Sequence, residues 1–303
     1  MTESSRERRH LSIQSSNIER TPNAIVTSLL GERPIKAASF IVTVYGDVVE
    51  PRGGVAWIGN LIEVCGDVGI SATLVRTAVS RLVAAGPLIG ERSGKRSFYR
   101  LTPDAQIEFA SAARQLFSPD KCDSWRFIYL SGEQIEDEAR HLERTGYFRV
   151  TPNLMVGCRP VPAFNQATIT VFDADVTQGA GFMRAFAQEF SNLSPLAVAY
   201  RGFIERYSGL KEQQVSARDA LPLRLLLVHD FRYVVLRDPN FPKDALPGDW
   251  PGDEARKLLS LLYLAWSNDA ENRIGRSFVS STGPLNAHTD ATRQRHNLLH
   301  HVS

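Results

Sequence analysis

Cysteine is scarce in this sequence, and long apolar runs are missing from it. The three cysteines, Cys65, Cys122 and Cys158, have neither the spacing of paired metal ligands nor the even number of a disulfide framework. We therefore expect reduced, packed thiols and no metal cofactor. The longest apolar runs, at 225–228 and 258–262, fall far short of the roughly 20 residues that span a bilayer, so no membrane partner is predicted.

Extreme composition is also absent. With 43% hydrophobic and 22% charged residues, the 303-residue chain has the composition of a soluble globular protein with two or three domains. Residues 1–21 mix Ser, Arg and Glu without the apolar middle of a secretion signal. We expect this segment to be a disordered tail and the protein to be cytoplasmic.

The net charge of +2 is too small to indicate a polyanionic partner, but its distribution is uneven. Between Ser71 and Arg100 there are six basic residues and a single acid, Glu91. The stretch from Ser131 to Thr145 instead holds five acids and two bases, which is typical of a solvated helix face. The excess positive charge is therefore local.

Three helices are predicted in the region of this charge. Apolar residues recur at helical spacing over 35–49 and again over 57–65. After a glycine-rich turn at 66–69, Ser71 can cap a third helix that runs to Ala85 and ends at Gly86-Pro87. A helix, a short turn and a capped helix are the order of a helix-turn-helix.

The third helix has two contrasting faces. At 100 degrees per residue, one broad face should be buried, namely Leu74, Val75, Ala78, Val79, Leu82 and Val83. The opposite face contains no acid and carries hydroxyl and guanidinium groups suited to base edges and phosphates in a major groove. With the capping serine, the predicted DNA-contacting residues of this helix are Ser71, Thr73, Arg76, Thr77, Ser80 and Arg81.

A basic hairpin is predicted directly after the third helix. Residues 88–92 and 97–101 have the composition of two short strands, and Gly94 permits a tight turn between them. Arg92, Lys95 and Arg96 lie near this turn, where they can neutralise backbone phosphates. The combination predicts a winged helix-turn-helix over residues 22–101.

These segments carry a family resemblance. The strings RPIKAASFIVTVYGDVVEPRGG, GISATLVRTAVSRLVAAG and GKRSFYRLT resemble the N-terminal domain of the phenylacetate-degradation repressors, the PaaX family. Further on, LLLVHDFRYVVLRDP and LPGDWPGDEARKLL resemble the C-terminal domain of that family. The likeness covers about residues 25 to 270. Pro87 departs from it, because the family pattern has an aromatic residue there.

The resemblance implies a function that composition and spacing do not provide. A PaaX-family member is expected to be a homodimeric transcriptional repressor of an aromatic-catabolism operon of the phenylacetate type. It binds double-stranded operator DNA and is released by an aryl-coenzyme A thioester such as phenylacetyl-coenzyme A.

The sequence pattern in the middle of the chain predicts a different fold from that of the N-terminal region. A linker helix over 102–120 leads to alternating strands and helices at 125–130, 134–144, 148–156, 167–172 and 182–190. This order indicates an α+β ferredoxin-like domain over 121–193, which we interpret as a dimerisation scaffold. In the PaaX family this central domain resembles the Cas2 nuclease fold. A metal-dependent nuclease is therefore the main alternative function. The first strand, however, ends in Ser131-Gly132 where such a nuclease has an acid, and Asp173 and Asp175 favour a turn over a metal pair.

Helices are predicted over most of the C-terminal third, at 196–207, 220–236 and 253–266. We interpret residues 194–280 as a helical effector-binding domain, because a phosphate-bearing thioester needs cations and aromatic walls. The candidate effector residues are Arg201, Arg224, His229, Arg232, Tyr233, Arg237 and Trp266. His229 with Asp230 suggests a core histidine more than a metal ligand, since no further histidine lies at ligand spacing before residue 281.

Residues 281–303 are polar and are predicted to be a second disordered tail, which contains His288, His296, His300 and His301. The predicted architecture is therefore α+β overall: a winged helix, a ferredoxin-like domain and a helical domain between two tails. No nucleophile with a base at suitable spacing is visible, so no enzyme is predicted. A coenzyme A-thioester enzyme regulated by its N-terminal domain stays open as a third function.

Overall fold

Residues 23–31, 35–117, 124–161 and 168–302 are described by the structure, which is a computed structural model. The N-terminal tail predicted at 1–21 and Cys122 lie outside these ranges. The described residues form a mixed α and β chain that ends in a helical part, so the predicted α+β class is confirmed.

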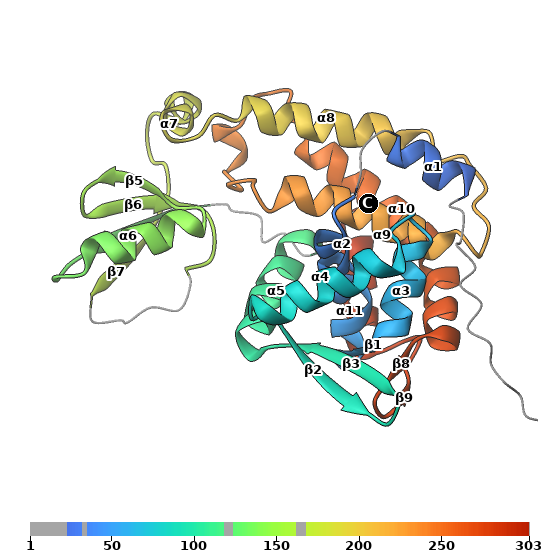
Figure 1. The fold of residues 1–303 in the computed structure, drawn as a ribbon. Helices are drawn as coiled ribbons and strands as arrows, with labels where there is room; N and C mark the ends of the chain where they lie inside the picture. The colour runs from blue at the N-terminus through green and yellow to red at the C-terminus, as the bar shows by residue number, and fades with distance from the viewer. Residues whose placement is uncertain (1–22, 32–34, 118–123, 162–167, 303) are drawn as a thin grey trace, which may run out of the picture.

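The first part of the chain contains three packed helices followed by a sheet (Figure 1). The apolar periodicity over 35–49 produces a helix that continues without a break into a π-helical turn. Gly69, at a φ of 81°, turns the chain between the next two helices. The elements are α1 (Ala24–Leu30), α2 (Ala37–Val44), η1 (Tyr45–Val49), η2 (Glu50–Arg52), β1 (Val55–Trp57), α3 (Ile58–Gly66), α4 (Ala72–Ala84), β2 (Leu88–Ser93), β3 (Arg96–Leu101) and α5 (Pro103–Phe117).

The sheet of this part has three antiparallel strands in the order β1-β3-β2. Its register pairs Trp57 with Phe98 and Leu88 with Leu101. Phe98, Leu88 and Leu101 are buried, so the base of the hairpin is anchored in the core while its tip extends into solvent.

A four-stranded antiparallel sheet in the order β5-β6-β4-β7 occupies the middle of the chain. One predicted strand, over 148–156, is wrong: it is a hairpin of two strands, since the chain turns at Pro152-Asn153 and Pro152 has no N–H to donate. The elements are β4 (Trp125–Leu130), α6 (Ile135–Arg144), β5 (Phe148–Thr151), β6 (Leu154–Gly157), β7 (Ile169–Ala174), η3 (Ala180–Phe182) and α7 (Met183–Phe190).

The two faces of this sheet are covered differently. Alternating residues of β4 place Ile128 and Leu130 against α6. Trp125, on the other face, packs on Phe186 of α7 and on Phe241, with ring centroids 5.3 and 5.2 Å apart. Part of that face is open, because Phe172 and Tyr129 are 53% and 43% exposed.

Three long helices dominate the C-terminal part. All but four residues of α9 are buried, in agreement with its nearly continuous apolar sequence. The predicted helix 253–266 continues to Ser277. Among the described residues, no helix is both long and apolar enough to cross a membrane. The elements are α8 (Ser194–Ser208), α9 (Ala220–Val235), η4 (Lys243–Ala245), α10 (Gly252–Ser277), β8 (Val279–Ser280), β9 (Gly283–Pro284) and α11 (Asp290–His300).

One hydrophobic core joins the first and last parts of the chain. It includes Phe40 and Val44 of α2 together with Leu227 and Phe231 of α9. The central sheet has two smaller clusters of its own, and in Figure 1 it stands to one side of the helices. The helices before and after the sheet therefore support each other directly.

The prediction of a disordered tail over 281–303 is wrong. Residues 290–300 form α11, whose N-terminus has a capping box between Thr289 and Thr292. Thr292 and Arg295 are 2% and 8% exposed, and Thr289 donates to the carbonyl of Pro51. The hydropathy pattern does not predict this helix, because much of its buried face is polar. The polar side chains of that face form hydrogen bonds with residues elsewhere in the chain.

Candidate nucleic-acid interface

Helix α4 begins and ends as the sequence predicts. The Ser71 side chain accepts a hydrogen bond from the Leu74 amide, with an O–N distance of 3.4 Å, and so caps the first turn. At the other end Gly86, at a φ of 97°, turns the chain toward β2. The helix is therefore held between a cap and a glycine turn.

The buried face of α4 is narrower than predicted. Val75, Ala78 and Val79 are buried, but Leu74 is 56% and Val83 is 39% exposed, so their placement in the core was wrong. The reason is that α2 and α3 cover only one stripe of the helix. Leu74 consequently lies at the surface between Thr73 and Thr77.

The polar face of α4 is fully accessible. Ser71, Thr73, Arg76, Thr77, Ser80 and Arg81 are all exposed. The Thr77 hydroxyl donates to the Thr73 carbonyl at 2.9 Å. Arg76 and Arg81 make no hydrogen bond or ion pair with any residue that the structure describes. Their guanidinium groups are available to an external acceptor.

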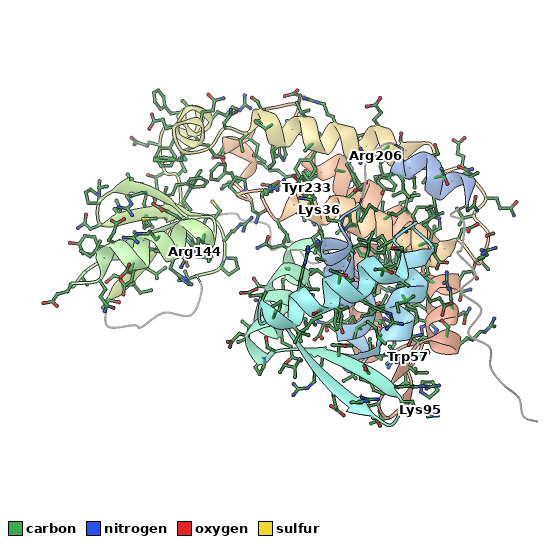
Figure 2. All side chains as sticks on the ribbon, viewed as in Figure 1. Lys36, Trp57, Lys95, Arg144, Arg206 and Tyr233 are labelled. Atoms are coloured by element: carbon green, nitrogen blue, oxygen red, sulfur yellow. The ribbon has the colours of Figure 1, made fainter. Side chains whose placement is uncertain are left out.

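The hairpin presents a second basic surface beside this helix. Figure 2 shows Lys95 at the free end of the β2–β3 hairpin, with Trp57 near it. The Arg96 guanidinium stacks on the Trp57 ring at 4.7 Å from its centroid, which fixes its direction. Arg92 donates from Nε to the Gly94 carbonyl at 3.3 Å and stays exposed.

An exposed, acid-free helix face next to a basic hairpin is chemically suited to a polyanion. Guanidinium and hydroxyl groups on the helix can donate to base edges or phosphates, and the hairpin cations can neutralise backbone phosphates. Such a surface is typical of the class of nucleic-acid-binding proteins.

Comparison with known proteins places the chain in a family. The family model described as PaaX-like protein matches residues 36–105, and that of the PaaX-like protein C-terminal domain matches residues 191–275. The chain belongs to the PaaX-like family.

Among individual proteins that resemble the chain, one is a named repressor and one is a solved structure. The Transcriptional repressor PaaX of Escherichia coli (strain K12) is 28% identical over 278 residues, which cover 84% of this chain and 88% of that protein. The structure of the uncharacterized protein Rv0674 from Mycobacterium tuberculosis matches with a TM-score of 0.47 and 18% identity, over 78% of this chain and 98% of that one.

The predicted effector residues do not form one site. Arg201 lines one cavity, His229 and Tyr233 line a second, and Arg232 lines a third. Arg201 is already paired with Asp249, and the Arg237 guanidinium lies 3.7 Å from the centroid of the exposed Tyr233 ring.

Two of the predicted effector residues are buried in this structure. Arg224 is 0% exposed, because it is enclosed between η1 and α10, and Trp266 is 4% exposed within the main core. Neither side chain can reach a ligand that arrives from solvent. The apolar residues around Arg224 and Trp266 in the sequence were sufficient to predict the two helices. They did not show whether each side chain points to the core or to solvent.

A buried ion-pair network surrounds Arg224, and sequence reasoning missed it. Arg224 donates from Nε to Asp47 at 3.0 Å and from Nη1 to Glu271 at 2.9 Å. Arg295 donates to the same Asp47 carboxylate at 3.0 Å, and Arg52 pairs with Glu271. The network connects η1 and η2 of the first part with α9, α10 and α11 of the last.

Burial and charge together set the protonation of this network. Burial raises the pKa of Asp47, but Arg224 and Arg295 more than compensate and hold that pKa below its usual range. Burial, and then the nearby Arg224 guanidinium, lower the pKa of Arg52 to about 10. Both side chains are therefore charged at neutral pH, as a paired network requires.

The histidine and acidic residues considered for metal binding have other contacts. The Nδ1 atom of His229 lies 2.9 Å from the Thr43 hydroxyl, and Asp230 accepts from Arg206 and Tyr207. Asp173 is paired with Arg126. Within the described ranges, no three His, Cys, Asp or Glu side chains are grouped to hold a metal ion. His296 packs beside Tyr263 and is not in a tail.

Proposed function

We propose that this chain is a DNA-binding transcriptional repressor. In this proposal, α2, α3 and α4 with the β2–β3 hairpin form a winged helix-turn-helix, α4 enters the major groove, and the hairpin contacts the backbone. The observation that carries the proposal is the exposed face of α4, on which every predicted contact residue is accessible and no acid is present. The Escherichia coli relative, named a transcriptional repressor, supports it.

The proposal extends to what is regulated. Family membership supports an operon for phenylacetate-type aromatic catabolism as the target, with release of the operator by an aryl-coenzyme A thioester. It also supports a homodimer in the cytoplasm. The open face of the central sheet, with Phe172 and Tyr129 exposed, offers an apolar surface for the partner subunit.

The recognition helix can be tested by removing its two free guanidinium groups. Arg76→Ala and Arg81→Ala should each weaken operator binding by about 1 to 3 kcal/mol if the side chain reads a base, and should lower discrimination against scrambled DNA. Gel-shift titrations with both DNAs measure the two effects separately. Arg114→Ala, which removes an exposed arginine from α5, is the matched control and should bind as the parent protein does.

Parent-like binding by both α4 variants would remove α4 from the interface. Equal loss on operator and scrambled DNA would instead assign the two arginines to phosphate contacts and leave base reading to other residues of the helix.

A further inference from the structure

Leu74 is an apolar side chain on a helix face that is otherwise polar. It is 56% exposed, whereas Val75 and Val79, on the stripe of α4 that α2 and α3 cover, are buried. Exposure alone does not indicate a partner, because single apolar residues are common on protein surfaces. The residues around Leu74 on the helix do indicate one.

Two of those residues continue the line of Leu74 along the helix. Thr77 and Arg81 follow it at three and seven positions, which places the three side chains on one stripe at 100 degrees per residue. The Thr77 hydroxyl donates to the Thr73 carbonyl at 2.9 Å, so its proton is used within the helix. Thr77 can therefore offer a partner its methyl group and an acceptor oxygen. The stripe begins apolar at Leu74 and ends with the exposed guanidinium of Arg81.

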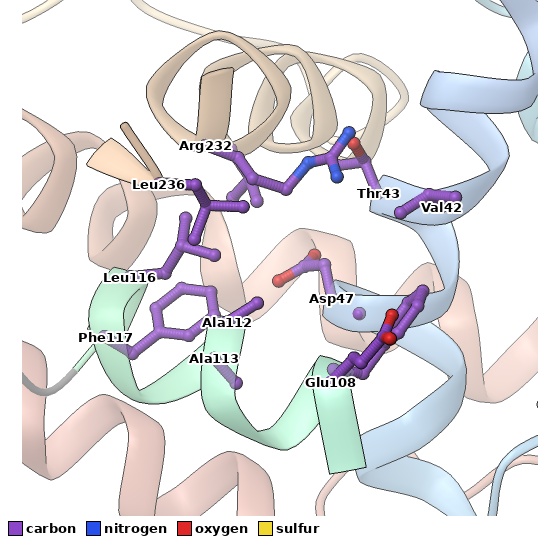
Figure 3. Close-up of a pocket in the computed structure, with 13 residues that line it drawn as sticks. Val42, Thr43, Asp47, Glu108, Ala112, Ala113, Leu116, Phe117, Arg232 and Leu236 are labelled. Carbon is purple, nitrogen blue, oxygen red and sulfur yellow. The ribbon is translucent and has the colours of Figure 1, made fainter. Parts of the chain in front are cut away.

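The shape of this surface excludes a small molecule as its partner. The three cavities lined by Arg201, His229 and Arg232 take no wall from α4, and Figure 3 shows the last of them, between α2, α5 and α9. Small molecules bind in concave sites, whereas the exposed face of a helix is convex. A convex face fits a macromolecule that provides the groove.

The major groove of DNA is such a groove, and charge favours it over a protein surface. It is about 12 Å wide and admits an α-helix. Helix α4 contains no acid, and Lys95 stands at the free end of the neighbouring hairpin (Figure 2), so cations lie on both sides of the leucine to meet the phosphates that border the groove.

One base presents an apolar group to this groove. The major-groove edge of thymine carries a C5 methyl group, which apolar side chains contact. The residues that reach base edges from a recognition helix are those near its N-terminus, and Leu74 is the third residue of α4. An apolar side chain at this position can therefore meet a thymine methyl.

We propose that Leu74 is a specificity-determining residue that reads the C5 methyl of a thymine, with the Thr77 methyl beside it. The inference rests on the proposed function and names the base that this position of α4 selects. Contact removes the leucine and the methyl from water together. A base without the methyl leaves part of Leu74 in water, and that difference in buried apolar surface is the source of the selection.

The test uses the full-length protein and a duplex that it selects from a randomised DNA library. Each thymine of that duplex is replaced in turn by uracil, which keeps every hydrogen-bonding group of the base and lacks only the methyl. Fluorescence anisotropy measures the affinities. At one or more positions we expect the parent protein to bind the uracil duplex about fourfold more weakly, as the loss of one buried methyl group predicts.

Four variants assign this effect to a side chain. Leu74→Ala should bind the thymine and uracil duplexes equally. Leu74→Met, which stays apolar, should keep the preference, and Leu74→Gln, of similar length with a polar end, should lose it. Val83→Ala is the matched control, because Val83 is 39% exposed but lies nine positions on, on the opposite side of α4, and this variant should keep the preference of the parent. Thermal unfolding establishes that all four fold.

Equal uracil sensitivity of the parent and Leu74→Ala at every position would overturn the inference, as would loss of the preference in Val83→Ala. Self-association that Leu74→Ala abolishes without a change in uracil sensitivity would also overturn it and would assign Leu74 to a protein contact. If the parent prefers no selected duplex over scrambled DNA, the proposed function itself is overturned. Selective binding without any uracil effect overturns only the role of Leu74.

Discussion

Asp47 is the residue on which most buried contacts between the two ends of the chain converge. Its carboxylate accepts from Arg224, Arg295 and the Tyr263 hydroxyl. Together with Glu271, it balances the guanidinium groups of Arg52, Arg224 and Arg295, so the described core of the network holds three cations and two anions. Removing an anion therefore leaves a larger imbalance than removing a cation does.

This charge imbalance predicts that losing Asp47 lowers the free energy of unfolding more than losing Arg224 does. Asp47→Asn leaves three guanidiniums with one carboxylate and should cost about 3 to 5 kcal/mol of unfolding free energy. Arg224→Met leaves two of each sign and should cost less, about 1 to 2 kcal/mol. Denaturant unfolding measures both, with the exposed Arg201→Met as a control expected within about 0.5 kcal/mol of the parent. A larger loss in Arg224→Met than in Asp47→Asn would contradict the charge count.

His296 adds a pH dependence at the edge of the same network. Burial, and then the Arg224 and Arg295 cations, lower its pKa from 6.5 to about 4. Its Nε2 lies 3.8 Å from Glu271, and Asp47 and His288 also act on it. Below pH 6.5 the unfolded chain binds a proton at this position that the folded chain does not, so the folded state loses stability as the pH falls from 6.5 to 4.

We therefore expect His296→Gln to flatten the decline of unfolding free energy between pH 6.5 and pH 4. The decline in unfolding free energy that the variant loses should be at most about 3.5 kcal/mol over that window, by the conversion of about 1.4 kcal/mol per pKa unit, and smaller because the ring is only half-buried. Denaturant melts at half-unit pH steps on both proteins provide the comparison. Parallel pH curves for the two would show that His296 titrates normally in the folded protein.

At the scale of elements, the β2–β3 hairpin and helix α4 have separate roles in the proposed complex. The hairpin carries its cations at an exposed tip anchored by Phe98 and Leu101, whereas the α4 face is defined by the burial of Val75 and Val79. An exposed basic tip suits phosphate contacts, and a helix face suits base reading in the major groove.

The hairpin contribution is expected in the salt dependence of binding. Lys95→Ala with Arg96→Ala should weaken operator and scrambled DNA to nearly the same degree, because phosphate contacts carry little sequence information. The slope of log K against log salt should become shallower by about 0.9 for each lost contact. Anisotropy titrations at four salt concentrations determine it. A slope equal to that of the parent would place the hairpin outside the interface.

Helix α11 shows how an element with few apolar residues can still be part of a core. Its capping box gives it a defined start, and Arg295 reaches the Asp47 carboxylate and the Gly46 carbonyl. Because α11 closes the network around η1, it supports the first part of the chain despite lying at the far end of the sequence.

At the scale of the whole molecule, the first and last parts of the chain share one hydrophobic core. A shift of a helix in one part therefore changes the packing of the other part. Helix α9 contacts α2 directly, with Arg232 bonded to Ser39 and His229 beside Thr43. A change in the spacing of α2 and α9 therefore affects both the cavity between α2, α5 and α9 and the support of α4. Two sites that bias one element must influence each other reciprocally.

This reciprocity predicts a thermodynamic linkage. If the aryl-coenzyme A thioester releases the operator, operator DNA must weaken thioester binding by the same factor, and about 5- to 150-fold is typical of such coupling. Calorimetric titrations of the thioester into free protein and into the operator complex measure that factor. Equal affinities in the two titrations would exclude the thioester as the inducer, however tightly it binds.

Several features follow from local sequence alone. The cap at Ser71, the glycine turn at Gly86 and the polar face of α4 are set by residues a few positions apart, so the helix and its accessible contact residues were predictable. The hairpin after it was predictable for the same reason. The exposure of Leu74 was not predictable, because its burial depends on which neighbouring helix covers that face of α4.

The network, the cavity and α11 were decided by the tertiary structure. Asp47 meets Arg224 across 177 positions and Arg295 across 248, and the cavity exists only where α2, α5 and α9 come together. Periodicity states which face of a helix is apolar but not which distant element will pair with a polar group on it. For that reason the sequence determined the exposed polar face of α4, while long-range packing decided which charges are buried and where the cavity between α2, α5 and α9 forms.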